Sequence, residues 1–150
     1  MLVHDFTYVD RPVEHVAGRL RDDPEGWLTA VAVASRVDEA SLCRRVGEAG
    51  DVPFLRRTAF VTCGDAAERG DVLLLPIAWM ADRLAGTAPI LEAEVEVAPL
   101  GADRTQVSLS GRYEPPAGDL GHHVDRLVLH RVAQATVRAF LERMRQTLDG

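Results

Sequence analysis

The stretch LEAEVEVAPLGADRTQVSLSGRY, residues 91–113, decides the fold. Its first half places glutamates at positions 92, 94 and 96 between apolar residues, and its second half alternates in the same way from 104 to 113. An alternation with a period of two is typical of a β-strand that buries one face and exposes the other. The short polar break at residues 101–103 therefore predicts an antiparallel hairpin.

The register of this hairpin follows from the same alternation. Facing residues of an antiparallel pair share one face of the sheet, so polar residues must lie opposite polar residues. A three-residue loop at 101–103 meets this condition, and the glycine at its start supplies the permissive backbone that such a loop needs. We therefore predict these three facing pairs: Glu92 with Arg112, Glu94 with Ser110, and Val95 with Leu109.

Further strands are predicted on the N-terminal side of the hairpin. Residues 2–9 alternate like a first strand, and residues 55–63 and 72–80 form apolar runs on either side of a turn-like segment at 64–71. The run at 72–80 is apolar on both faces, which predicts that both faces are covered. Pro76 inside it cannot donate a ladder hydrogen bond, which indicates an edge position or a bulge. Residues 81–88 are expected to form a loop.

Helices are predicted before and after these strands. A short helix is expected from Val13 to Leu20, interrupted by residues 23–26, and one or two helical pieces are expected from Trp27 to Ala49. The run at 30–33 is also compatible with a strand. The prolines at 115–116 end the last strand. Residues 120–148 then predict a long terminal helix, and its wide apolar arc indicates that most of it is covered.

Composition limits the partners and the compartment. The chain has 150 residues, which predicts one domain, and its formal charge of −6 argues against nucleic acid and anionic membranes. No apolar run is long enough for a membrane span, and the first residues do not resemble a signal peptide. We therefore expect a cytoplasmic protein in which Cys43 and Cys63 are free thiols. The sequence leaves open whether the protein forms a homodimer.

Four segments of the second half resemble bacterial members of one superfamily. They are residues 76–79, 96–101, 109–116 and 129–133. The order of one strand, short helices, antiparallel strands and a long terminal helix is similar to the α+β helix-grip fold. This fold is shared by the START lipid-transfer domains, the birch-pollen allergen and the polyketide cyclase/dehydrase group, together called SRPBCC. The resemblance implies a curved sheet around the terminal helix and a cavity between them for a hydrophobic ligand.

The candidate ligand-binding residues combine the apolar face of the hairpin with the middle of the terminal helix. Small Ala93 and Gly111 on that face leave room, and Trp79 and Tyr113 each offer an apolar body with one hydrogen-bond donor. The full set that we predict is Trp79, Leu91, Ala93, Val95, Leu109, Tyr113, Val128, His130, Arg131 and Val132. The alternative is that these side chains simply form a dry core.

Signals for catalysis and for metal binding are weak. A histidine such as His130 in a cavity could transfer a proton near neutral pH, but a structural role is favoured for it. Arg131 is expected to bind a carboxylate, either of a neighbouring segment or of a ligand head group. The adjacent histidines at 122–123 point about 100° apart on a helix, so they cannot chelate one ion. We predict no metal site, no cofactor and no catalytic residue.

Three functions stay open at this point. The favoured one is binding of a lipid- or polyketide-like molecule in the cavity. The second is a polyketide cyclase or dehydratase, with Tyr113, His130 and Arg131 as candidate groups, so the sequence leaves open whether the protein is an enzyme. The third is an interaction domain whose core is filled.

Overall fold

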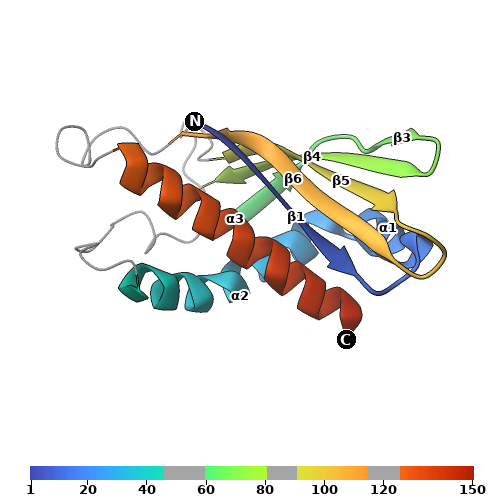
Figure 1. Ribbon diagram of the computed structural model, residues 1–150. Helices are drawn as coiled ribbons and strands as arrows, with labels where there is room; N and C mark the ends of the chain where they lie inside the picture. The colour runs from blue at the N-terminus through green and yellow to red at the C-terminus, as the bar shows by residue number, and fades with distance from the viewer. Residues whose placement is uncertain (46–59, 81–90, 115–125) are drawn as a thin grey trace.

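The computed structural model describes residues 1–45, 60–80, 91–114 and 126–150 (Figure 1). Its strands are β1 Leu2–Val9, β2 Phe60–Cys63, β3 Ala67–Arg69, β4 Val72–Met80, β5 Leu91–Pro99 and β6 Thr105–Tyr113. Its helices are α1 Val13–Arg21, α2 Pro24–Arg45 and α3 Arg126–Asp149. The predictions for residues 46–49, 55–59 and 81–88, and for the start of the last helix, lie outside the described residues.

The central hairpin has the predicted register. β5 and β6 pair Glu92 with Arg112, Glu94 with Ser110 and Val95 with Leu109. The loop at residues 101–103 is closed by a hydrogen bond of 2.8 Å from the amide of Leu100 to the carbonyl of Arg104. Gly101 adopts a φ of 88°, which glycine reaches without a steric penalty. The antiparallel sheet continues outward from this hairpin in the order β1-β6-β5-β4-β2.

Strand β4 changes its partner near Pro76. β2 pairs with the second half of β4, and the three-residue strand β3 pairs with its first half. At the junction the amide of Gly64 donates to the carbonyl of Pro76 at 2.8 Å, and Pro76 needs no partner on its own nitrogen. The prediction of a turn throughout residues 64–71 is therefore wrong for residues 67–69, which form β3. The outer face of β4 is less covered than predicted, since Leu74 is buried but Pro76 is exposed.

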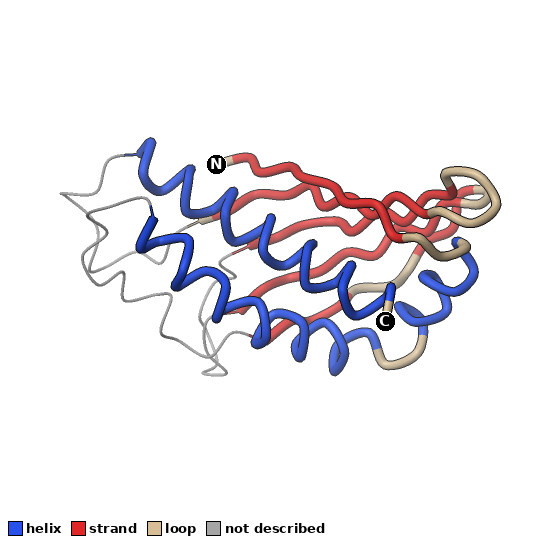
Figure 2. Tube along the Cα trace, turned by 60° about the horizontal axis from the view of Figure 1, so that its bottom comes forward, coloured by secondary structure: helices blue, strands red, loops and turns tan. Residues whose placement is uncertain are grey.

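The three helices cover one face of the sheet, as Figure 2 shows. Helix α2 is continuous and begins at the segment where we expected an interruption. Asp23 precedes it with a φ of 52°, and its carboxylate accepts the amide hydrogen of Gly26 at 3.2 Å. This is the usual role of an aspartate before the first turn of a helix. Residues 30–33 are helical, so the strand alternative for them is excluded.

Helices α2 and α3 are tied to opposite edges of the sheet. On the β2 edge, the hydroxyl of Thr29 in α2 accepts the amide hydrogen of Val61 at 3.0 Å. On the β1 edge, the guanidinium of Arg138 in α3 lies 3.1 Å from the carboxylate of Asp5. The two helices also contact each other. The inner face of the sheet is thus covered by two helices that are attached at its two sides.

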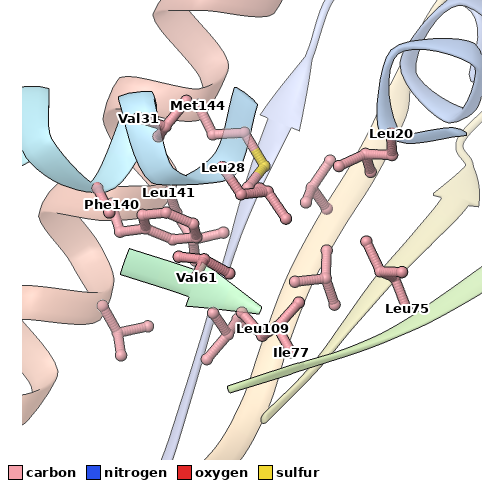
Figure 3. Packing of buried hydrophobic residues seen from close by; sticks show 14 of the residues in the cluster. Leu20, Leu28, Val31, Val61, Leu75, Ile77, Leu109, Phe140, Leu141 and Met144 are labelled. Atoms are coloured by element: carbon pink, nitrogen blue, oxygen red, sulfur yellow. The ribbon is translucent and has the colours of Figure 1, made fainter. Parts of the chain in front are cut away.

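The core lies between these helices and the sheet (Figure 3). Helix α3 contributes one stripe to it, namely Ala133, Val137, Phe140, Leu141, Met144 and Leu148. Leu127 of the same helix is 67% exposed, and Ala135 and Ala139 are only partly buried. The covered arc of α3 is therefore narrower than its wide apolar pattern predicted. None of the described helices is both long enough and apolar enough to cross a bilayer.

Candidate functional site

A row of large side chains crosses the inner face near one end of the sheet. Trp79 of β4 faces Leu91 of β5, which in turn faces Tyr113 of β6. All three residues are buried. Phe140 of α3 reaches this row from above, because its ring centroid lies 5.2 Å from that of Trp79 with the rings tilted by 51°. An aromatic pair of this geometry joins the helix to the sheet.

The next row along the strands is lined by smaller residues. There Ala93 lies between Ile77 and Gly111 on the inner face. Ala93 and Gly111 keep accessible surface, whereas Val95 and Leu109 in the following row are both 0% exposed. Val95 is on the same strand and the same face as Ala93, with the same kind of solvent-facing neighbours. Ala93 is thus only partly buried, although it packs against the core.

The small size of Gly111 has a separate explanation. A Cβ atom added at Gly111 would lie 2.5 Å from the Cβ of Ala93 and 2.7 Å from its Cα, and it would also collide with the carbonyl oxygen of Glu92. Real Cβ atoms do not approach other heavy atoms so closely. Gly111 is thus required for the close approach of β5 and β6. Of the two small residues, only Ala93 can be linked to space for a ligand.

The comparisons with known proteins bear on the fold. No protein-family model matches the sequence, and no curated protein matches it significantly. A START superfamily protein from Mycobacterium smegmatis has a similar structure, with 13% identity and a TM-score of 0.52, over 99% of this chain and 97% of that one. The chain has the helix-grip fold of the START superfamily.

Two further solved structures match more distantly. A protein from Thermus thermophilus is 14% identical with a TM-score of 0.46, over 99% of this chain and 97% of that one. The Zhui aromatase/cyclase from Streptomyces is 17% identical with a TM-score of 0.43, over 99% of this chain and 93% of that one.

Within this helix-grip fold, the two polar candidates on α3 do not reach the interior. The side chains of His130 and Arg131 are both exposed. His130 lies seven residues before the buried Val137 and therefore on the same side of α3, so its exposure reflects its place near the start of the helix and not the rotation of the helix. The side chains of Val128 and Val132 lie outside the described part of the structure.

Strand β2 adds one more ionisable group to the inner face, the thiol of Cys63. It is half-buried on β2, and its backbone amide donates to the carboxylate of Glu25 at 2.9 Å. Burial, and to a lesser extent the negative charge of Glu25, raises the pKa of Cys63 to about 11. The thiol is therefore protonated at neutral pH and unsuited to act as a nucleophile. The described residues contain no group of three side chains that could hold a metal ion.

Two contributions to the site were missed by the sequence reasoning. Val61 of β2 faces Trp79 and is 2% exposed, and helix α2 adds Leu28 and Val31 to the core. The helical spacing of Trp27, Leu28, Val31 and Ala32 is the sequence signal that could have revealed the contribution of α2.

A hollow lies at the first half of β4, away from Trp79. It has a volume of about 170 Å³ and lies between α1 and the β3–β4 turn, lined by Val13, Glu14, Ala17, Arg21, Glu68, Gly70, Asp71, Val72 and Leu73. Leu73 lies four positions before Ile77, the residue that faces Ala93, which corresponds to about 13 Å along a strand. This hollow is therefore distinct from the surroundings of Ala93.

Proposed function

We propose that the protein binds a hydrophobic small molecule over Ala93, between the central strands and α3. The observation that supports the proposal is the partial exposure of Ala93 on the inner face, two positions from Val95 at 0%. The helix-grip fold typically holds hydrophobic ligands, which supports the same position.

The proposed site has a chemically simple lining. Trp79, Leu91 and Tyr113 border Ala93 on one side, and Val95 and Leu109 close the other side. Binding is expected to come mainly from removal of apolar surface from water, at about 25 cal/mol per Å². The indole and phenol groups are the donors that could orient an oxygen of the ligand. Val128 and Val132 of α3 remain proposed members of the lining.

The first test is identification of a bound molecule. The protein is purified without detergent from its natural host and analysed by native mass spectrometry, followed by extraction of the bound fraction. An apolar metabolite at one molecule per chain is the expected result. An empty protein whose melting temperature also ignores a panel of fatty acids and aromatic polyketides contradicts the proposal and favours a filled core.

A matched pair of variants locates the ligand. Ala93→Leu adds three carbons where the space is proposed, and binding of the identified ligand should weaken at least tenfold, or by about 1.4 kcal/mol. Ala98→Leu makes the same change on the same strand but on the opposite face, and it should leave binding unchanged. Both variants are first checked for folding by circular dichroism. Equal affinities of the two variants would place the ligand elsewhere.

A further inference from the structure

The hollow between α1 and the β3–β4 turn has an apolar floor. Its volume is about 170 Å³, and α1 and the turn lie at the same end of the sheet (Figure 1). Ala17 of α1 and Leu73 of β4 line it and are 4% and 2% exposed. Val13 and Val72, both half-buried, extend the apolar lining. The hollow therefore offers apolar surface that a small molecule can cover.

The rim of the same hollow is charged. Glu14 and Arg21 come from α1, Glu68 comes from β3, and Asp71 comes from the turn, and all four are exposed. Arg21 and Glu68 form an ion pair that joins α1 to β3. Among the residues that the structure describes, Glu14 and Asp71 have neither an ion pair nor a hydrogen bond through their carboxylates. With Arg21 and Glu68 cancelling each other, the rim keeps a net formal charge of −2.

The carboxylates of the rim are spread around the hollow. Glu14 precedes Arg21 by seven residues, which corresponds to about 10.5 Å along the helix axis. Glu68 pairs with Arg21 and so belongs to the other end of α1. In the described ranges of the chain, no three acidic, histidine or cysteine side chains are arranged to hold a metal ion. A compact ion therefore does not match the rim, whereas a molecule with charges at two separate points does.

We propose that this hollow binds a short organic dication, in which two ammonium groups are joined by an alkyl chain. One ammonium group pairs with Glu14 and the other with Asp71, the two carboxylates that have no partner in the protein. The alkyl chain lies over Ala17 and Leu73 and removes their accessible apolar surface from water. The two positive charges of the ligand match the net charge of the rim.

The size of the hollow limits the ligand to a few carbon atoms. Sites for drug-sized molecules usually have about 300–1,000 Å³, and this hollow has about 170 Å³. Because the carboxylates are exposed, each ion pair contributes little and is screened by salt. We therefore expect modest affinity, a clear dependence on salt and an optimum in the length of the alkyl chain.

The test is a titration of the ¹⁵N-labelled full chain with 1,4-diaminobutane, followed by two-dimensional NMR at low and at physiological salt. Saturable shifts are expected at the amides of Ala17, Gly70 and Leu73, and they should weaken as salt rises. The monoamine 1-aminobutane should bind about threefold more weakly, because it lacks one ion pair. Diamines with three to eight carbons should show one preferred length.

Three outcomes of this titration overturn the proposal. The first is the absence of saturable shifts at low salt. The second is equal binding of the monoamine and of diamines of every length, which would show a response to charge alone. The third is the same set of saturable shifts with Mg²⁺, which would assign the hollow to an inorganic ion.

Variants of the rim locate the two ammonium groups. Glu14→Gln and Asp71→Asn should each weaken binding of 1,4-diaminobutane about threefold, and the double variant about tenfold. Both positions are exposed, so folding should be unaffected, and the NMR spectrum checks this. Glu92→Gln removes an exposed carboxylate from β5, outside the hollow, and should leave binding unchanged. If it weakens binding as much as Glu14→Gln, net charge alone attracts the ligand and the proposal fails.

A variant of the ion pair gives an effect of the opposite sign. Arg21→Gln removes the cation of the rim and frees the carboxylate of Glu68, so binding should become about threefold tighter. Arg112→Gln removes an exposed cation from β6 and serves as the matched control. Weaker binding in Arg21→Gln, or an equal gain in both variants, would contradict the proposal.

This proposal does not depend on the site at Ala93. Ala93→Leu should leave the binding of 1,4-diaminobutane unchanged, because Leu73 lies about 13 Å along the strand from the residue that faces Ala93. Glu14→Gln should likewise leave the binding of a hydrophobic ligand unchanged. The two proposals can therefore fail separately.

Discussion

The two faces of the β5–β6 hairpin are built from the same strands and have opposite tasks. On the inner face Val95 and Leu109 are fully enclosed, and Gly111 is fixed by the close approach of the strands. On the outer face Glu94 and Ser110, one position away on each strand, are exposed. The comparison teaches that stability resides almost entirely on one face, while the other face is free to vary with function.

The largest loss of stability is expected for Phe140→Ala, in the helix that packs on the inner face. This change removes a ring that is 0% exposed and contacts Trp79, so the free energy of unfolding should fall by about 3–5 kcal/mol. Leu127→Ala, on the exposed part of the same helix, should cost less than about 0.5 kcal/mol. Urea denaturation measures both. A cost below 1.5 kcal/mol for Phe140→Ala, by the same scale, would mean that α3 is loosely packed on the sheet.

The next effect is expected at Gly111. Gly111→Ala forces β5 and β6 apart and should destabilise the protein by about 1–3 kcal/mol. Adding Ala93→Gly should recover only part of this loss, because the Cα of residue 93 and the carbonyl of Glu92 still collide with the new methyl group. Ser110→Ala, one position along and on the outer face, serves as the control. Full recovery in the double variant would show that the side chain of Ala93 is the only obstacle.

A smaller loss of stability is expected at Thr29, whose hydroxyl is hydrogen-bonded to the edge strand β2. Thr29→Val removes the hydroxyl that accepts from the amide of Val61, and the loss should be about 1–2 kcal/mol. Hydrogen exchange should accelerate at the amide of Val61 and much less at Val95 in the centre of the sheet. Unchanged exchange at Val61 would mean that water replaces the hydroxyl without cost.

The smallest effect is a pH dependence at Cys63. Its pKa is raised from 9.0 to about 11, so the folded protein favours the protonated thiol. The contribution to stability is complete below about pH 9 and is lost as the pH rises towards 11. Iodoacetamide labelling of the peptide that contains Cys63, followed by mass spectrometry, should stay slow until this range. Rapid labelling at pH 8 would contradict the raised pKa.

The sequence predicted the hairpin well because its polarity has a strict period of two. A slip of one residue would bury the glutamates of β5, so only one family of registers was acceptable. Helix α2 was harder, since the short apolar run at 30–33 fits a helix and a strand equally. Strand β3 was missed because its three residues, Ala67–Arg69, are all exposed and leave no apolar pattern.

The candidate site was predicted only in part, for a related reason. The strand positions were fixed by the hairpin register, but the rotation of α3 was not. Its alanines and valines form several similar stripes, and packing against the sheet selects the one with Val137 and Phe140. That choice turns Arg131 outward, to the side of the exposed Arg138, whereas His130 shares the side of Val137 and is exposed near the start of the helix. The rotation of a helix with a wide apolar arc depends on its neighbours, which one sequence does not reveal.

The side-chain contacts at the two edges of the sheet also bear on aggregation. An open edge strand offers main-chain donors to which another chain can add. Here the amide of Phe6 donates to the carboxylate of Asp5 at 2.8 Å, and the amides of Val61 and Cys63 donate to Thr29 and Glu25. The β2 edge, with the amides of Val61 and Cys63 both occupied, is therefore a poorer template for a further strand than the β1 edge, where one amide is occupied.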